Sequence, residues 1–333
     1  MRKYLFKFLL ILISINLLTV SCLDEVDDDP PKPAPPQPEW SVQNIAGISK
    51  PLNCVFFYNE NNGWIAGNDG AFIHTNNGGL GWSNSISISP DNIYDIFFID
   101  TLQGWVVGSN GTILRTNNGG SNWDAQNSET VSDLKGVYFI GPLNGWVVGS
   151  AVGSGVATIL HTTNGGTSWE KQETEIYNDL HSVFFIDENK GWAVGIDSSI
   201  ILTNNGGAEW EEINSGILVN QNKIVFLDDL TGWIAGDHGG LYKSMDGGYH
   251  WQSQAPFTLF ELYDICFADV DNAWVTGRGG KMFHSDNEGA DWQAQFSGTD
   301  AYLRSLSFTS KENGWAVGET KEGKDIVLHC YIK

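Results

Sequence analysis

Apolar residues recur along the chain at fixed distances from a repeated Gly-Trp-x-x-Gly frame, in which Ala273 once replaces the first glycine. A Phe stands seven residues before each tryptophan of this frame, and an aliphatic residue stands two positions before that Phe. A period of two marks one buried face of a β-strand. The position between them is also mostly apolar, so we predict a strand covered on both faces, followed by a second strand that carries Gly-Trp-x-x-Gly. The tryptophans of the frame are Trp64, Trp105, Trp146, Trp192, Trp233, Trp274 and Trp315.

A short turn, "RTNNGGSNWDAQ" from Arg115 to Gln126, recurs in five near-copies and supplies a second tryptophan series. That series is Trp82, Trp123, Trp169, Trp210, Trp251 and Trp292, and Trp40 continues it 42 residues before Trp82. The spacing of the first series is 41 residues except for one step of 46, and the two series account for all 14 tryptophans. Four strands in about 41 residues match one blade of a β-propeller.

The unequal ends of the repeat predict how the ring closes. The last unit stops at "DIVLHCYIK", a third strand with no turn or fourth strand after it, and the first unit opens with "WSVQN" from Trp40. Pairing these two segments removes the open edge of the last sheet. We therefore predict an all-β, seven-bladed propeller of four-stranded antiparallel blades over residues 40–333, closed by the N-terminal strand.

The recurring turn resembles the Asp-box (BNR) hairpin, S/T-x-D-x-G-x-x-W. Either Asn or Asp can accept backbone N–H bonds in such a turn, and Gly permits positive φ. We interpret the turn as structural, fastening each blade to its neighbour without catalytic chemistry. Asp246 keeps the acid of this motif, and Asn replaces it at Asn77, Asn118, Asn164, Asn205 and Asn287.

The first 39 residues predict export and anchoring. A basic start, a short apolar run and "TVSC" ending at Cys22 indicate a signal peptide over 1–21, and "TVSC" resembles a bacterial lipobox with Cys22 as the lipidated residue. The acidic, proline-rich segment 22–39 reads as a solvated tether, similar to the export signal of Bacteroidetes surface lipoproteins. We expect an outer-membrane or cell-surface lipoprotein, attached to the membrane through the lipid alone.

Charge excludes some partners. Without the three basic residues of 1–21, 40 acidic residues face 15 Lys and Arg, a formal charge of −25. Nucleic acid and anionic membrane surfaces would repel such a chain. Cys22, Cys54, Cys266 and Cys330 show no zinc spacing or disulfide framework. Four histidines precede the recurring turn, one per blade (His74, His161, His284 and His329), and we interpret them as structural. We expect no metal, no cofactor and a monomer.

One column of the repeat differs from blade to blade, eleven residues before each Gly-Trp tryptophan. Packing would favour repetition, so polar and aromatic variation around a channel mouth suggests recognition. Two loops of the same face are enlarged, at 150–157 and 319–325. The column is Asn53, Tyr94, Lys135, His181, Asn222, Tyr263 and Arg304, and further candidates from the loops are Asp197, Asp237, His238 and Arg278.

The seven units resemble the photosystem II stability/assembly factor-like propellers. Family members assist the assembly of membrane protein complexes by binding partners, so the resemblance implies a non-enzymatic binding or scaffold role. We predict that the propeller recognises a protein or glycan partner and assists the assembly of an envelope complex. The photosynthetic members carry an arginine-bearing face, whereas this chain has three arginines after the signal, so we do not expect a photosystem client. The alternative is a glycoside hydrolase, sialidase-like or endoglucanase-like, acting through rim carboxylates such as Asp197 and Asp237.

Overall fold

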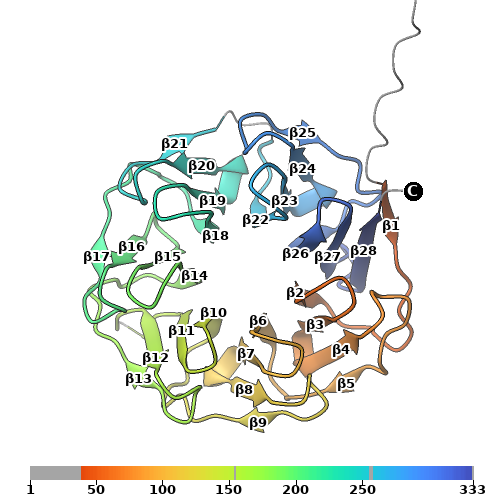
Figure 1. Ribbon diagram of the computed structural model, residues 1–333, viewed down its shortest axis with the longest axis horizontal. Helices are drawn as coiled ribbons and strands as arrows, with labels where there is room; N and C mark the ends of the chain where they lie inside the picture. Colours follow the sequence, from red (N-terminus) through yellow and green to blue (C-terminus); the bar gives the residue numbers. More distant parts are fainter. Residues whose placement is uncertain (1–38, 154, 255–257, 332–333) are drawn as a thin grey trace, which may run out of the picture. The chain divides into compact units, whose positions relative to one another are not determined.

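The computed structural model describes residues 39–153, 155–254 and 258–331, which form seven four-stranded antiparallel sheets around a central channel (Figure 1). The predicted all-β seven-bladed propeller is confirmed. The expected signal peptide, Cys22 and the tether up to residue 38 lie outside the described residues, and the first strand begins at Glu39, one residue before the expected boundary. Within the described ranges, no helix is long and apolar enough to cross a membrane.

Each blade runs from an inner strand at the channel to a short outer strand. The first three blades are β2 (Leu52–Phe57), β3 (Gly63–Gly67), β4 (Ala71–Thr75) and β5 (Ile86–Ser87); β6 (Ile93–Phe98), β7 (Gly104–Gly108), β8 (Ile113–Thr116) and β9 (Asp124–Ala125); and β10 (Leu134–Ile140), β11 (Asn144–Gly149), β12 (Thr158–Thr162) and β13 (Glu170–Lys171). The next three are β14 (Leu180–Phe185), β15 (Gly191–Gly195), β16 (Ile200–Thr203) and β17 (Glu211–Glu212); β18 (Gln221–Phe226), β19 (Gly232–Gly236), β20 (Leu241–Ser244) and β21 (Gln252–Ser253); and β22 (Leu262–Phe267), β23 (Ala273–Gly277), β24 (Met282–Ser285) and β25 (Gln293–Ala294).

The seventh blade combines the two ends of the described chain. It consists of β26 (Tyr302–Ser310), β27 (Asn313–Glu319), β28 (Asp325–Tyr331) and β1 (Glu39–Val42), in that order from the channel outward. β1 is antiparallel to β28 with Trp40 opposite Cys330 (Figure 1). The predicted closure by the N-terminal strand is therefore confirmed.

The outer strands are shorter than expected. In blades 1 to 6 each has two residues and begins after the Asp-box tryptophan, which is itself outside the strand. An outer strand has a neighbour on one side only, and its residues are exposed, so little burial supports a longer ladder.

Three aromatic rings join each pair of neighbouring blades. Between blades 1 and 2, Trp64 stacks on Phe98 of the next inner strand with ring centroids 3.6 Å apart, and Trp123 of the Asp-box turn meets Phe98 edge-on at 6.1 Å. Trp64 Nε1 also donates to the Gly119 carbonyl in that turn (2.8 Å). Truncating one such buried ring would lower the free energy of unfolding by about 3–5 kcal/mol.

The same cluster repeats around the ring with small variations. The Trp–Phe centroids are 3.6 Å apart at the next three interfaces, 3.8 Å at Trp274–Phe308 and 5.2 Å at Phe57–Trp315, whereas Trp233 and Phe267 are tilted at 6.0 Å. At the closing blade Trp40 takes the place of the Asp-box tryptophan. It meets Phe308 edge-on at 5.7 Å, and its Nε1 donates to Gln295 Oε1 (3.1 Å), as Trp169 does to Gln126 and Trp210 to Gln172.

The Asp-box turn is held by its own side chains. In blade 2, Gly120 N donates to Thr116 Oγ1 (3.0 Å), and Asn122 N donates to Asn118 Oδ1 (2.9 Å). Asn therefore performs the accepting role that the motif gives to Asp. A Cβ on Gly120, whose φ is +90°, would lie 2.5 Å from the ring of Phe72 in blade 1, so the turn can approach the neighbouring blade only with glycine there.

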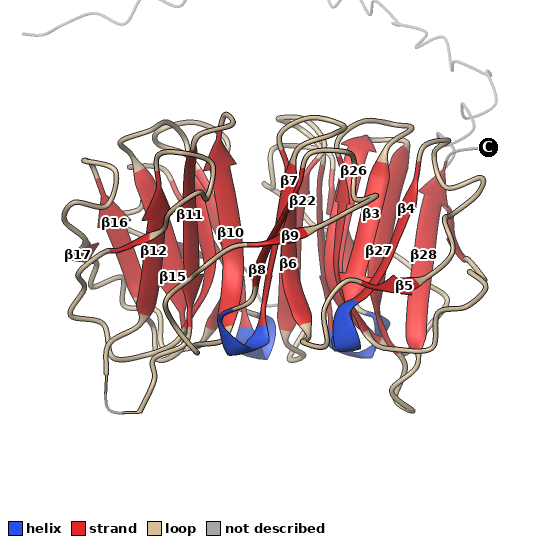
Figure 2. Cartoon of the chain, turned by 90° about the horizontal axis from the view of Figure 1, so that it is seen from below, coloured by secondary structure: helices blue, strands red, loops and turns tan. Residues whose placement is uncertain are grey.

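The two faces of the ring are built from different loops. Four 3₁₀ turns, η1 (Asn68–Gly70), η2 (Ser109–Gly111), η3 (Asp237–Gly239) and η4 (Arg278–Gly280), join the second and third strands at one end of the blades, the lower edge in Figure 2. The loops that cross from one blade into the next inner strand, here called crossing loops, reach the same end, since Gly111 N donates to Ser132 O and Gly280 N to Ala301 O. We call this end the ring face and the opposite end the Asp-box face.

Two glycine substitutions test the contact between turn and neighbour. Gly289 and Gly216 both have φ +71°, but a Cβ on Gly289 would lie 2.3 Å from the Trp233 ring, whereas nothing lies within 4 Å of one on Gly216. We expect Gly216→Ala to lower the unfolding free energy by about 1–2 kcal/mol from backbone strain alone. Gly289→Ala should lower it by about 1–3 kcal/mol more, measured by urea denaturation. Equal losses for the two variants would contradict the packing described here.

Candidate functional site

The seven residues of the variable column occupy the same structural position in every blade. In each inner strand the pairing register to the second strand slips across this residue, for example between Leu52 and Cys54 and between Ile93 and Asp95, so the column residue is the extra residue of a β-bulge. A bulge turns a side chain out of the ladder and is common beside functional sites. The pairing of the two strands therefore does not constrain which residue type stands at this position.

The bulged residues all line one small cavity of about 90 Å³ at the channel mouth on the ring face. The structure thus brings together the whole column that the sequence singled out, and we call these seven residues the channel-mouth ring. They are Asn53, Tyr94, Lys135, His181, Asn222, Tyr263 and Arg304.

Three members of the ring hold the next blade. The side chains of Asn53 and Asn222 donate to the carbonyls of Ile93 (2.7 Å) and Leu262 (2.8 Å), each the first residue of the next inner strand. His181 Nδ1 lies 3.0 Å from the corresponding carbonyl of Gln221. Burial lowers the pKa of His181, so its imidazole is neutral at pH 7 and Nδ1–H donates to that carbonyl.

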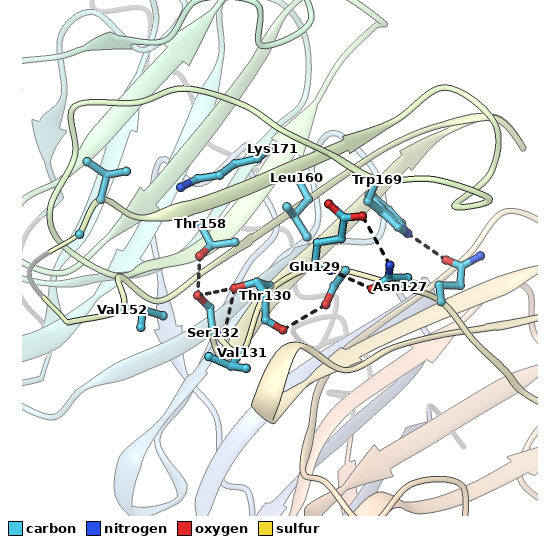
Figure 3. Close-up of a pocket in the computed structure, with 14 residues that line it drawn as sticks. Asn127, Glu129, Thr130, Val131, Ser132, Val152, Thr158, Leu160, Trp169 and Lys171 are labelled. Carbon is cyan, nitrogen blue, oxygen red and sulfur yellow. Dashed lines mark hydrogen bonds between the residues drawn. The ribbon is translucent and has the colours of Figure 1, made fainter.

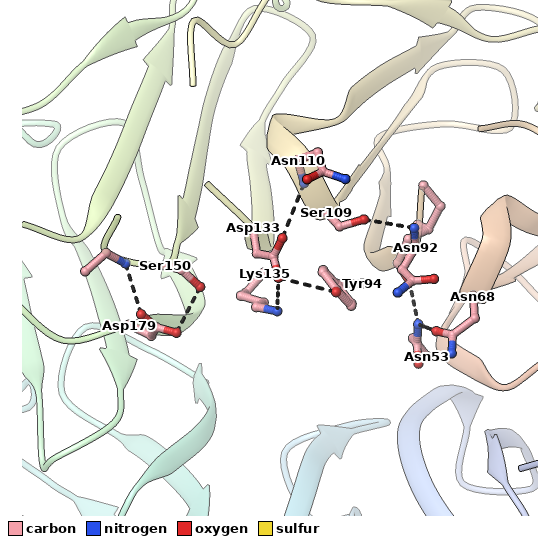
Figure 4. A network of polar contacts seen from close by, with 12 residues as sticks. Asn53, Asn68, Asn92, Tyr94, Ser109, Asn110, Asp133, Lys135, Ser150 and Asp179 are labelled. Carbon is pink, nitrogen blue, oxygen red and sulfur yellow. Dashed lines mark hydrogen bonds and ion pairs between the residues drawn. The ribbon is translucent and has the colours of Figure 1, made fainter. Parts of the chain in front are cut away.

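A charged cluster lies between blades 2 and 3 of the ring (Figure 4). The Lys135 ammonium lies 3.7 Å from the centroid of the Tyr94 ring and 3.2 Å from Asp133 Oδ2, which also accepts from the Tyr94 hydroxyl (3.4 Å). Across the ring, Arg304 pairs with Glu319. The ring therefore presents a cation on an aromatic face, two amides, a neutral imidazole and a second cation, a set suited to polar recognition.

Beneath the ring lies a layer of buried charge that the sequence analysis missed. Lys223 Nζ is 3.9 Å from Asp264 Oδ1, and Asp95 belongs to the same layer. Burial opposes the charge of Lys223, but the carboxylates of Asp264 and Asp95 outweigh it and raise the pKa of the ammonium, so Lys223 is charged. Each Asp also accepts a backbone N–H from the next inner strand, Asp95 from Val137 (2.9 Å) and Asp264 from Leu306 (2.8 Å).

Further down, the channel is apolar. A cavity of about 370 Å³ is lined by all seven inner strands, and Phe56, Phe97, Tyr138 and Phe184 contact one another in sequence with centroids 4.9–5.5 Å apart. These residues belong to the column that was predicted to lie on a covered face of the inner strand. They are half-buried, and neighbours from consecutive blades cover one another around the channel.

The loop candidates serve chiefly to join blades. Asn220 donates through Nδ2 to Asp237 Oδ2 (2.8 Å) and accepts from the backbone N–H of Asp197 (3.0 Å), and Asn222 donates to Asp237 Oδ1 (3.0 Å). Both carboxylate oxygens of Asp237 therefore accept hydrogen bonds from asparagine side chains. Asp197 takes part through its backbone N–H and is exposed to solvent. The same junction recurs in Asp133 with Asn110 and in Asp179 with Ala151 (Figure 4).

The remaining two loop candidates lie in 3₁₀ turns. His238 has φ +55° at the centre of its turn. Arg278 pairs with Glu261 (3.2 Å) and lies over the Tyr302 ring. Neither residue lines the channel-mouth cavity.

The enlarged loop at 150–157 helps to form a hollow on this face (Figure 3). A cavity of about 730 Å³ lies between that loop and the crossing loop of 126–132, lined by Glu129, Val131, Val152, Trp169 and Lys171 among others. It contains both charges and exposed apolar groups.

The histidine column has a structural role. The rings of His161, His284 and His329 stack on the Gly-Trp tryptophan of the adjacent strand, with centroids 4.0–4.7 Å apart, and Arg115 and Lys243 lie over the corresponding rings. Burial lowers the pKa of each of these histidines. In the part of the chain that the structure describes, no three His, Cys, Asp or Glu side chains gather closely enough to hold a metal ion.

These features define an Asp-box, seven-bladed propeller with a variable ring on one face, and comparison with known proteins gives its family. The family model described as photosynthesis system II assembly factor YCF48 matches residues 84–176, 168–255 and 216–294, together more than half of the chain. The chain belongs to this family, as its sequence resemblance implied. No curated protein matches the sequence.

Solved structures agree on the fold. The chain is similar to a structure described as YCF48 bound to D1 peptide (19% identity, 90% of this chain and 99% of that chain, TM-score 0.72) and to YCF48 from Cyanidioschyzon merolae (20%, 88% and 98%, TM-score 0.70). It is also similar to the GH74 enzyme of Niastella koreensis, with 13% identity and a TM-score of 0.69. The match covers 86% of this chain and 53% of that chain, so this chain spans about half of the enzyme.

Replacing Lys223 by Met tests the buried charge layer. Asp264, whose side chain is 6% exposed, would lose its cation, and we expect the unfolding free energy at pH 7 to fall by about 1–3 kcal/mol, less than for a fully buried pair because Lys223 is 36% exposed. Burial raises the pKa of Asp264 above that of the unfolded chain, so its contribution is favourable at low pH and is lost as pH rises. The deficit of the variant relative to the native protein should therefore shrink between pH 7 and pH 4.

Urea denaturation at several pH values measures this deficit. Lys50→Met, which removes the exposed partner of Asp69, is the control and should show little loss at any pH. A deficit in Lys223→Met that is constant with pH would contradict the assignment.

Proposed function

We propose that this chain is a non-enzymatic binding propeller that holds a protein partner on its ring face during assembly of an envelope complex. One observation carries the proposal: seven bulged residues of five types converge on a single cavity, while the surrounding framework repeats from blade to blade. Side chains that the ladder does not constrain, gathered at one mouth, are suited to recognition of a specific partner.

Family membership supports a protein as the partner, because the matching family is that of an assembly factor and a structurally similar YCF48 was solved bound to D1 peptide. The N-terminal pattern supports attachment through a lipid at Cys22, which would hold the ring beside a membrane while its acidic body stays in solution. A glycan is the alternative ligand for the same ring.

A hydrolase is the runner-up because a GH74 enzyme shares the fold. This chain has one propeller and spans about half of that enzyme, and both oxygens of Asp237 are engaged by asparagines. We therefore expect no release of sugar from an oligosaccharide library by the purified protein. Hydrolysis that Asp197→Ala or Asp237→Ala abolishes would overturn the non-enzymatic proposal.

The ring is tested by removing three of its side chains together. We expect Tyr94→Ala/His181→Ala/Tyr263→Ala to weaken binding of a partner captured by the native protein at least about tenfold, since central aromatic contacts contribute most to an interface. The measurement is a pull-down from envelope extract, followed by titration of the purified partner and a parallel glycan array.

The matched control is Tyr58→Ala/Tyr249→Ala, which removes exposed aromatic rings from the Asp-box face. It should leave binding unchanged. Full binding by the triple variant would show that the ring is not the site, and binding to glycans alone would replace the protein partner with a carbohydrate.

A further inference from the structure

Four consecutive crossing loops on the ring face expose an apolar side chain at the same position, four residues before the ring residue. Val131, Tyr177, Leu218 and Leu259 are 73%, 66%, 89% and 83% exposed, respectively. Single exposed apolar residues are ordinary, but four at equivalent places in consecutive blades form a row along one face. The other three blades have Ser49, Pro90 and Asp300 at this position, so the feature is an arc outside the ring rather than a property of the repeat.

Hollows lie beside the arc. Leu218 borders a cavity of about 400 Å³ that Asp197 and Glu212 also line. Val131 borders the 730 Å³ cavity, together with Val152 and Glu129 (Figure 3). An apolar group placed against Val131 or Leu218 would therefore have a recess beside it, and burial of its apolar surface there would favour binding.

The crossing loops that carry the arc are acidic. Their residues 126–133, 172–179, 213–220 and 258–261 contain no Lys or Arg, and their six acidic residues are Glu129, Asp133, Glu173, Glu175, Asp179 and Glu261. Asp133 and Glu261 pair with Lys135 and Arg278, and Lys171 lines the cavity beside Val131, so the negative charge of the arc comes mainly from the other four acids. A partner that covers the apolar groups must pass close to these carboxylates, and cationic side chains would gain from that approach.

We propose that this arc is a docking surface for a protein segment in which apolar and basic side chains alternate. The inference rests on the proposed protein-binding function and adds the chemistry of the partner. A second copy of this chain would bring the same acids to the interface, and an anionic membrane would repel a chain of formal charge −22. Apolar anchors with an acidic surround therefore select a basic, amphipathic polypeptide.

Defined peptides test the chemistry. Three fluorescent octapeptides, alternating Leu with Lys, Leu with Ser or Leu with Glu, are titrated with the purified protein by anisotropy. The Leu–Lys peptide should bind most tightly, and its affinity should fall with added salt because exposed charges are screened. Equal binding of the Leu–Glu peptide would overturn the proposal.

Matched variants test the place. Val131→Ser/Leu218→Ser/Leu259→Ser should weaken Leu–Lys binding at least about tenfold, as expected when an interface loses its apolar anchors. Leu80→Ser/Leu102→Ser/Leu143→Ser, which removes side chains 92%, 55% and 55% exposed from the Asp-box face, is the control and should bind as the native protein does. An equal loss in the control, or no loss in the arc variant, would contradict the assignment.

The captured partner separates this inference from the proposed function. Binding lost in the ring variant but retained in full by the arc variant leaves the proposed function standing and overturns the arc. Retention by both variants overturns both. Binding of native protein, but not of the arc variant, to neutral phosphatidylcholine vesicles would show a membrane as the occupant and would also overturn the arc proposal.

Discussion

The contact on which the structure depends is the packing of one blade's Gly-Trp tryptophan against the phenylalanine of the next inner strand, under an Asp-box tryptophan. It stacks closely at most interfaces and loosens at Trp233–Phe267. The sheets hydrogen-bond internally, so adhesion between blades comes from these rings, from indole donors to turn carbonyls and from side chains such as Asp95 that reach the next strand. Tight packing explains why the tryptophan and phenylalanine columns hardly vary.

The same constraint leaves the channel mouth free to differ. Each ring residue is outside the ladder pairing, so Tyr94, His181 and Arg304 can occupy equivalent positions without strain in the sheet. Some of this freedom is used structurally, because Asn53, His181 and Asn222 hold the neighbouring blade. The remainder, with the arc of exposed apolar residues outside the ring, gives one face the variation that a binding protein needs. The opposite face is built from near-copies of one turn.

The blade number, the closure and the channel-mouth ring could be predicted from sequence alone because each depends on the spacing of a repeat. The fourteen tryptophans recur at regular intervals and give the number of blades. The position of Trp40 in the second series predicts that the N-terminal strand completes the last blade. The buried charge layer was missed because Asp95, Lys223 and Asp264 belong to a column of mixed residue types, with Cys54, Gly136, Ser182 and Ser305, and lie in different blades that only the channel brings together. Likewise, sequence could not show that Asp237 is held by Asn220 and Asn222, since those contacts depend on turn geometry.

The closed ring can be tested directly by shortening the chain. Protein that begins at residue 38 keeps β1, whereas protein that begins at residue 44 loses it, and with it the ring contact between Trp40 and Phe308. We expect the first to unfold thermally as the full chain does and the second to unfold at a clearly lower temperature, since each 1 kcal/mol shifts the midpoint by roughly 2 °C in a domain of this size. Identical midpoints for the two would contradict a ring that depends on its N-terminal strand.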